Sequence, residues 1–245
     1  MRYIRDIGSY FLMIKRIFGS FTKGSVLKEL IFKEIEDLII GSLGIVVFIS
    51  FFVGGVIAIQ TALNVNNPII PKSLIGFATR QSIVLEFAPT FMSIIMAGKV
   101  GSLITSSIGS MRVTEQIDAL EVMGINSLNY LVFPKIVALS LYPLVIGISM
   151  FLGILGGWVA GVYGGFSSST DFIAGLQDDF QVFHLVYAFI KTCVFAFILA
   201  TVPSWQGYFM KGGALEVGKA STNSFVWTSV LIILANYIIT QLLLS

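Results

Sequence analysis

The chain has 245 residues, of which 56% are hydrophobic and 11% are charged, with a mean hydropathy of +0.92 and a formal net charge of +2. Soluble domains carry roughly a quarter of charged residues, so this composition excludes a soluble globular domain and indicates an integral membrane protein. The small, dispersed positive charge excludes a nucleic-acid partner, because no tract of Lys and Arg is present to neutralise phosphates. Cys193 is the single cysteine, so no internal disulfide can form.

The first 22 residues carry an apolar stripe whose members are spaced alternately three and four apart: Ile4, Ile7, Phe11, Ile14, Phe18 and Phe21. Most of the charges in this segment lie off the stripe. The pattern predicts an amphipathic helix lying in the cytoplasmic interface of the membrane, with a helix packed on a soluble core as the alternative. A cleavable signal peptide is not expected, because charges flank a short apolar core and no small-residue cleavage site follows.

A helix needs about 20 mostly apolar residues to cross a bilayer. Four stretches meet this requirement comfortably, namely 38–63, 131–163, 185–207 and 223–244. A fifth span is expected at 74–98, although it carries charged residues, and it continues as a small-residue tail toward the aqueous side. The sequence therefore predicts an all-α integral membrane protein with five membrane-spanning helices.

The distribution of Lys and Arg predicts which connections face the cytoplasm, because positively charged loops stay on that side. Seven of these residues lie in 1–37, three in 99–135 and two in 208–222. In contrast, the segment 164–184 has none and the segment 64–73 has one. We expect the last two segments to face outward, with the N-terminus cytoplasmic and the C-terminus periplasmic.

Small residues recur every four positions in two of the expected spans. The first row is Ser50, Gly54, Ala58 and Ala62, and the second is Ser149, Gly153, Gly157, Gly161 and Gly165. Such faces let helix backbones approach closely in lipid. Two interpretations stay open: one face forms the seam of a dimer, or both serve packing within one subunit.

Charged residues are expected inside the membrane at Arg80, Glu86 and Lys191. Arg80 and Lys191 lie near the outer ends of their helices, where long basic side chains can reach the interface, so a structural role is expected for both. Glu86 lies deeper, and its short side chain should be protonated, paired with Arg80 or Lys191, or facing a wet cavity. A proton-coupled carrier using Glu86 is one alternative function.

The residues of common catalytic motifs are missing from the sequence. His184 is the only histidine, and no second His, Cys or carboxylate stands at metal-ligand spacing from it. Neither GxSxG nor the phosphate loop GxxxxGK[ST] occurs. The sequence therefore predicts no metal site, no ATPase site and no bound cofactor in this chain.

A short acidic stretch, GSMRVTEQIDALEVMGIN at 109–126, interrupts the apolar chain on the predicted cytoplasmic side. Its acids recur three apart, at Glu115, Asp118 and Glu121. The pattern predicts a helix over 114–124, with Thr114 as N-cap and Gly124 as C-cap. Such a helix either docks a partner or is a solvated loop helix.

The run AGKVGSLITSSIGSMRVTEQIDALEVMGINSLNYLVFPKIVA resembles the signature of the MlaE/YrbE family, the permease subunits of ABC transporters that work with MCE proteins. LEFAP upstream and GGALEVGKASTNSFVWTSVLIILANYIITQLLL downstream extend the resemblance over nearly the whole chain after residue 40. The resemblance implies that 114–124 is the coupling helix that seats in the ATPase subunit. Five residues there match the family pattern, Glu115, Gln116, Leu120, Glu121 and Met123, and Asp118 lies in the same helix.

The resemblance also implies a homodimer of five-span subunits in the inner membrane, which moves phospholipid between membranes. Two cytoplasmic ATPase subunits, which use ATP and Mg²⁺, and a periplasmic MCE ring are the implied partners. Because the family's cavity lies near the dimer axis between the first and last spans, the expected contacts with acyl chains are Phe51, Phe52, Ile59 and Leu234. A membrane anchor that holds an MCE protein without transporting lipid is a second alternative.

The chain departs from the family pattern in its membrane charges. Leu85 and Ser107 stand where family members often have Arg and Glu, and Asn236 stands where many have Asp. Any ion pair that relatives make with those charges is therefore expected to be absent here.

Overall fold

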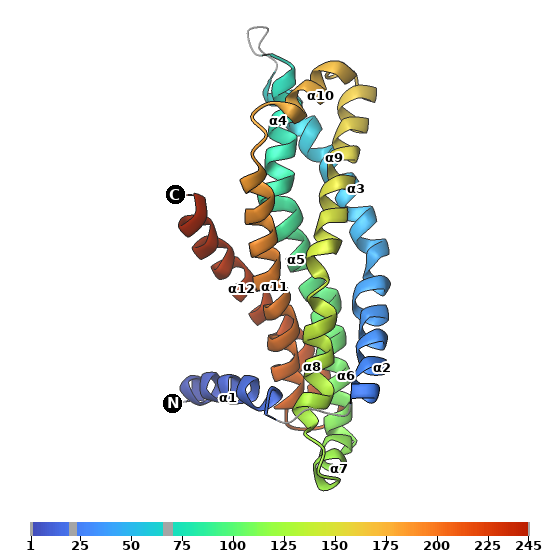
Figure 1. Ribbon diagram of the computed structural model, residues 1–245, viewed down its shortest axis with the longest axis vertical. Helices are drawn as coiled ribbons and strands as arrows, with labels where there is room; N and C mark the ends of the chain where they lie inside the picture. Colours follow the sequence, from blue (N-terminus) through green and yellow to red (C-terminus); the bar gives the residue numbers. More distant parts are fainter. Residues whose placement is uncertain (1, 20–23, 66–70, 245) are drawn as a thin grey trace. The chain divides into compact units, whose positions relative to one another are not determined.

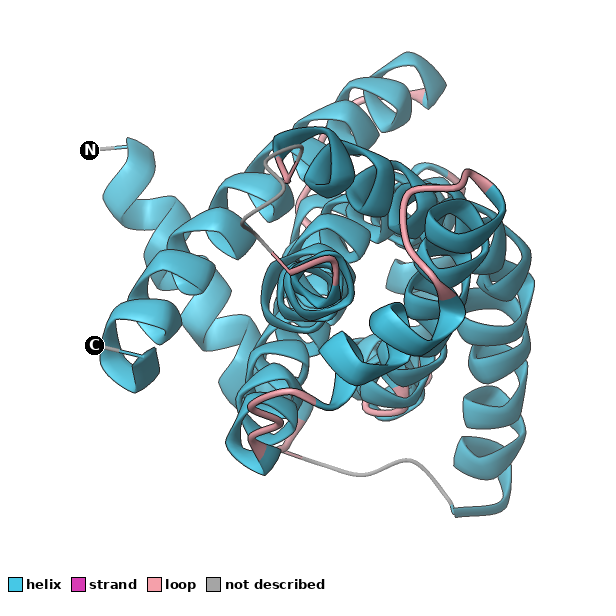
Figure 2. Ribbon diagram, turned by 90° about the horizontal axis from the view of Figure 1, so that it is seen from above, coloured by secondary structure: helices cyan, strands magenta, loops and turns pink. Residues whose placement is uncertain are grey.

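A computed structural model describes residues 2–19, 24–65 and 71–244 of the chain, and these form helices, turns and loops without strands (Figures 1 and 2). Five helices are long and apolar enough to cross a membrane. Their bounds are Gly24–Asn64, Ser73–Val113, Ser127–Tyr163, Val182–Tyr208 and Ala214–Leu244. Each encloses one of the stretches expected from hydropathy, so the prediction of an all-α protein with five long apolar helices is confirmed.

The first three of these helices are each built from consecutive segments. The segments labelled η1, η2 and η3 are wound as π-helix. In chain order the elements are α1 (Arg2–Ile17), α2 (Gly24–Glu34), η1 (Ile35–Ile40), α3 (Gly41–Asn64), α4 (Ser73–Ser82), η2 (Ile83–Phe91), α5 (Met92–Met96), η3 (Ala97–Gly101), α6 (Ser102–Val113), α7 (Gln116–Val122), α8 (Ser127–Leu139), α9 (Tyr142–Tyr163), α10 (Ser169–Gln177), α11 (Val182–Tyr208) and α12 (Ala214–Leu244). Pro89 lies inside η2, where its missing N–H and its ring disturb the regular hydrogen-bond ladder.

Contacts between residues divide the chain into two compact units. The first comprises residues 1–42, 94–142 and 194–238. It includes α1, α2, α6, α7 and α8, and an ion pair between Lys135 and Glu34 joins α8 to α2. All three segments expected on the cytoplasmic side belong to this unit. In Figure 1, α1 runs crosswise to α8, and α7 lies beyond the ends of α6 and α8.

The second unit comprises residues 43–93, 143–193 and 239–245, and within it α3 packs closely on α9. The hydroxyls of Ser50 and Ser149 are hydrogen-bonded at 2.7 Å. A Cβ atom added to Gly54 would lie 1.9 Å from the carbonyl oxygen of Gly153, so only glycine permits this approach. Ser50 and Gly54 of the first row thus pack against Ser149 and Gly153 of the second within one subunit.

A second close contact in this unit joins α4 to α10. A Cβ atom on Gly76 would lie 2.2 Å from the carbonyl oxygen of Phe172. Arg80 is only 5% exposed, and its guanidinium donates to the carbonyl oxygens of Leu176 at 2.7 Å and Asp179 at 3.3 Å. Both acceptors lie in the segment 164–184, which the sequence predicts to face outward. These contacts fit the structural role expected for Arg80.

Candidate functional site

The acidic helix α7 starts later than its sequence suggests. Thr114 closes α6 instead of capping α7, and its hydroxyl donates to the carbonyl oxygen of Ser110 at 2.9 Å. The expectation that Thr114 is the N-cap was therefore wrong. Glu115 holds that position with a φ of 60°, a left-handed conformation that costs a non-glycine residue about 1 kcal/mol. The chain accepts this strain because α6 must turn sharply into α7.

The end of α7 follows the expected glycine cap. Gly124 has a φ of 75°, and its N–H donates to the carbonyl oxygen of Glu121 at 3.0 Å. The N–H of Ile125 donates to the carbonyl oxygen of Leu120 at 3.0 Å, which completes a Schellman motif. Asn126 then caps α8 by accepting from the backbone N–H of Asn129 at 3.3 Å. One tight turn therefore joins α7 to α8.

Side chains from the rest of the first unit hold α7 in place. Ile117 is fully buried beneath it. The Oε1 atom of Glu121 accepts from the hydroxyls of Ser127 at 3.0 Å and Tyr208 at 2.9 Å. Sequence reasoning assigned Glu121 to the partner surface and missed Ser127 and Tyr208, because nothing in the sequence relates α11 to this loop. Glu121, although exposed, thus joins α7 to α8 and α11.

An exposed ion pair makes a weaker contribution to the same region. Arg112 Nη1 lies 2.7 Å from Asp118 Oδ1, and both side chains are well exposed. Such pairs contribute about 0–1 kcal/mol in water. Beside it lies a polar hollow of about 170 Å³, and its lining consists of Arg112, Asp118, Glu121, Tyr208, Phe209, Met210 and Lys211. Both acids within α7, Asp118 and Glu121, therefore line this hollow.

The surface that α7 leaves open combines polar and apolar side chains. Val122 is 89% exposed and Met123 is 64% exposed, whereas Leu120 is half-buried. Glu115 and Gln116 are exposed at the other end of the helix. The apolar part of this surface is therefore centred on Val122 and Met123 more than on Leu120, which the sequence singled out.

The membrane charge of Lys191 is completely buried in the second unit. Its ammonium donates to the carbonyl oxygen of Leu85 at 3.0 Å, to Glu86 Oε1 at 3.0 Å and to the hydroxyl of Tyr187 at 2.8 Å. Three ammonium hydrogens thus meet three acceptors. The ammonium of Lys191 therefore does not reach the surface of the chain, and its contacts fit the structural role expected for this residue.

Glu86 adopts one of the three states expected for it, an ion pair with Lys191. Its second oxygen, Oε2, accepts from the hydroxyl of Thr90 at 3.1 Å, and the side chain remains 43% exposed. The network continues from Tyr187 to the hydroxyl of Thr240 on α12, at 2.7 Å. These residues therefore link η2, α11 and the last turns of α12.

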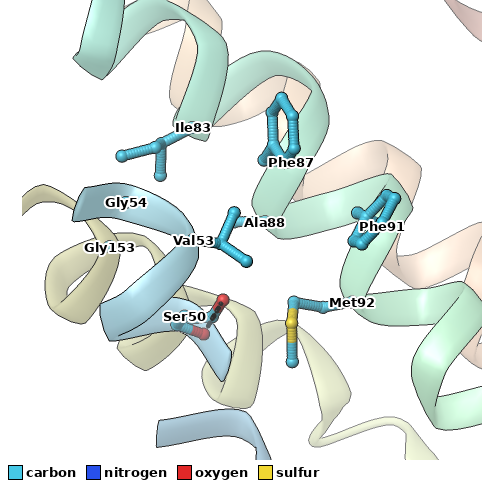
Figure 3. A pocket seen from close by; sticks show the side chains of 10 residues that line it. Ser50, Val53, Gly54, Ile83, Phe87, Ala88, Phe91, Met92 and Gly153 are labelled. Atoms are coloured by element: carbon cyan, nitrogen blue, oxygen red, sulfur yellow. Dashed lines mark hydrogen bonds between the residues drawn. The ribbon is translucent and has the colours of Figure 1, made fainter. Parts of the chain in front are cut away.

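Aromatic and aliphatic side chains expected to touch lipid are mostly at the surface of the chain. Phe52, Ile59 and Leu234 are exposed, whereas Phe51 is half-buried, with its backbone close to α9 at Gly156. Contact with acyl chains stays a prediction for all four. Between α3, η2 and α9 lies a small, mainly apolar hollow (Figure 3). The residues lining it include Val53, Ile83, Phe87, Phe91 and Met92, and the hydrogen-bonded pair Ser50 and Ser149.

The chain is similar over most of its length to several proteins, most of them named as probable ABC transporter permeases. A family model described as Permease MlaE matches residues 31–242. A Rickettsia bellii protein named "Probable ABC transporter permease protein" is 31% identical over 99% of this chain and 93% of its own length. A Synechocystis protein, also named a probable ABC transporter permease protein, is 29% identical over 95% of this chain and 89% of its own. The Arabidopsis thaliana "Protein TRIGALACTOSYLDIACYLGLYCEROL 1, chloroplastic" is 29% identical over 82% of this chain and 57% of its own length.

Proposed function

The chain belongs to the MlaE permease family, and on that premise we propose that it is the transmembrane subunit of an ABC transporter that moves phospholipid between membranes. A permease of this class implies separate ATPase subunits, which bind ATP and Mg²⁺. The work of transport therefore has to enter this chain through a contact with those subunits.

A lipid cargo is supported by how the polar side chains of the membrane helices are used. Lys191, the most buried charge, has each of its hydrogens directed at a protein acceptor, and Arg80 binds the end of α10. Polar cargo such as a sugar needs side-chain partners in the membrane, whereas the exposed faces of the spans carry mainly Phe, Leu, Ile and Val. One relative also bears the name of a galactolipid.

The observation that carries the proposal is the construction of α7. Both of its ends are fixed, Ile117 and Glu121 bind it to the first unit, and Val122 and Met123 point out of the chain. A short helix held in this way transmits force as a rigid element, and its free apolar surface suits a groove on a protein partner. We therefore propose α7 as the ATPase-coupling helix, with Leu120, Glu115, Gln116 and Met123 in or beside the contact.

The remaining partners are proposed from the family and from the exposed apolar surface of α12. α12 is the least buried of the five membrane helices, with 11% of its most apolar stretch buried in one chain, so a broad apolar face is left for lipid or for a second copy. This supports a homodimer. We place the protein in the inner membrane, with the N-terminus cytoplasmic and an MCE protein on the periplasmic side.

The experiment compares aspartate substitutions at matched apolar positions, with co-purification of the ATPase as the measurement. Leu120→Asp and Val122→Asp each introduce a charge into the proposed contact and should weaken ATPase binding by about 2 kcal/mol or more. Val182→Asp changes a similarly exposed valine on a segment expected outside, and it should retain the ATPase. Normal retention by both α7 variants, with dimerisation intact, would remove α7 from the docking surface.

A second measurement separates lipid transport from the alternative functions. The complex in proteoliposomes should move a fluorescently labelled phosphatidylethanolamine in the presence of ATP, and movement should stop when ATP is omitted. Movement driven by a pH gradient without ATPase subunits would favour the carrier that uses Glu86. Normal assembly with an MCE protein and no lipid movement in either condition would favour the membrane anchor.

A further inference from the structure

The segment that follows α7 holds the end of the amphipathic helix α1. The side-chain amide of Asn126 donates to the carbonyl oxygen of Arg16 at 2.9 Å, and that of Asn129 donates to the carbonyl oxygen of Ile17 at 2.8 Å. The last carbonyls of a helix have no regular donor within the helix. The Arg16 carbonyl also accepts from the backbone N–H of Gly19 at 3.1 Å, so Asn126 is its second donor. Asn129 is fully buried, which shields its bond from water.

A second attachment joins α1 to α11. The indole N–H of Trp205 donates to the hydroxyl of Ser9 at 3.0 Å, and the hydroxyls of Tyr10 and Thr201 are 2.7 Å apart. Burial raises the pKa of the Tyr10 hydroxyl above its ordinary value, so the group stays protonated at neutral pH. Met13, 1% exposed, adds apolar packing. α1 is therefore bound along its length and not only at its end.

The coupling helix is attached to the same two helix ends. Ser127 follows Asn126 directly in the sequence, and its hydroxyl donates to Glu121 of α7. Tyr208 lies three residues beyond Trp205 on α11, and its hydroxyl also donates to Glu121. Any displacement of α7 therefore acts on the start of α8 and the end of α11, and both of these hold α1.

We infer that α1 is a moving part of the coupling apparatus, and that Asn126 and Asn129 are positioning residues that make it follow α7. The inference rests on the proposed role of α7 as the ATPase docking helix. Ile7, Phe11 and Leu12 are about 60% exposed on α1, which gives this helix apolar contact with the lipid interface. Movement of α7 is thereby passed to the membrane surface, where it disturbs the packing of the surrounding leaflet.

Asn126→Asp is the sharpest perturbation of this link. Aspartate keeps the side-chain oxygen that caps α8, but it has no amide to donate to the Arg16 carbonyl. The matched control is Asn64→Asp, which removes an equivalent bond from an exposed amide to the carbonyl of Gln60 at 3.0 Å. Asn129→Leu provides an independent second variant, since it removes the other donor without introducing a charge.

The measurement places a fluorescent reporter on α1 in the complex with its ATPase subunits. Gly8 is exposed and has space for a side chain, so Gly8→Cys in a Cys193→Ala background gives a single labelling site. The complex is studied in nanodiscs of phosphatidylethanolamine and phosphatidylglycerol. Reporter emission and hydrolysis rate are recorded without nucleotide and after trapping with ATP and vanadate.

The emission of the otherwise unchanged chain should respond to trapping. In Asn126→Asp and Asn129→Leu this response should fall about five-fold, because the loss of one hydrogen bond changes an equilibrium constant by about that factor. The rate of ATP hydrolysis should stay within about two-fold of that of the unchanged chain. The inference is overturned if the unchanged chain shows no emission response to trapping. It is also overturned if both variants respond as strongly as Asn64→Asp, or if they lose hydrolysis and response equally. Failure of the ATPase to co-purify at all would instead refute the proposed function.

Discussion

The buried ion pair between Lys191 and Glu86 allows a quantitative prediction. Lys191→Met removes the ammonium, which leaves the Leu85 carbonyl without this donor and Glu86 without its counter-charge. Leaving one partner of a buried pair uncompensated costs about 3–5 kcal/mol. The lower end applies here, because the Glu86 side chain is 43% exposed and keeps its bond from Thr90. We therefore expect a loss of about 3 kcal/mol in unfolding free energy.

Two further variants test whether the cost of Lys191→Met comes from the unpaired charge of Glu86. Glu86→Gln keeps an oxygen that can accept from Lys191, so it should cost only about 1 kcal/mol. The double variant, Glu86→Gln with Lys191→Met, contains no unpaired charge and should be more stable than Lys191→Met alone. It should also retain substantial lipid transport, because a structural pair has no proton to carry.

Thermal unfolding of the detergent-solubilised protein measures the stability of the two single variants and the double variant. A loss of about 3 kcal/mol corresponds to a fall in Tm of roughly 10 °C for a chain of this size. If Lys191→Met unfolds at the same temperature as the original chain, the pair is not a stabilising element. If the double variant is assembled and stable but abolishes ATP-driven transport, the residues take part in transport itself.

Two further predictions concern packing and sidedness. Gly54→Ala should lower stability by about 3 kcal/mol, because its methyl group would overlap the backbone of α9, whereas Gly44→Ala has open space and should be neutral or stabilising in the same thermal assay. In a Cys193→Ala background, an impermeant thiol reagent added outside should label Thr170→Cys but not Gln116→Cys, both exposed positions. Equal stability of the two glycine variants would contradict the packing of α3 on α9. Labelling of Gln116→Cys but not of Thr170→Cys would reverse the proposed orientation.

Features governed by local composition were predictable from the sequence. The five long helices follow from runs of about 20 apolar residues, which have few other stable structures in a bilayer. The glycine cap at Gly124 follows from the freedom of glycine to adopt a positive φ. Both properties depend on a single stretch of chain, so no knowledge of distant residues was needed.

Features that depend on distant partners could not be predicted in the same way. Lys191 and Glu86 are 105 positions apart, and the sequence allowed two basic partners for that glutamate. Arg80 donates to the backbone carbonyls of Leu176 and Asp179, at and just beyond the end of α10, and backbone carbonyls carry no sequence signal. The left-handed Glu115 was missed because the sharp turn between α6 and α7, and not the residue type, requires it.

Three charged side chains connect helices within the two units. Lys191 joins η2 to α11, Arg80 joins α4 to α10, and Glu121 joins α7 to α8 and α11. Because a polar group without a partner is costly in lipid, these networks limit how far neighbouring helices can separate within a unit. ATP-driven motion is therefore expected to move bonded groups of helices together. A cargo bound through apolar contacts tolerates such movement, since those contacts are non-directional and slide without a large change in energy. Movement of bonded groups of helices is thus compatible with the proposed lipid cargo.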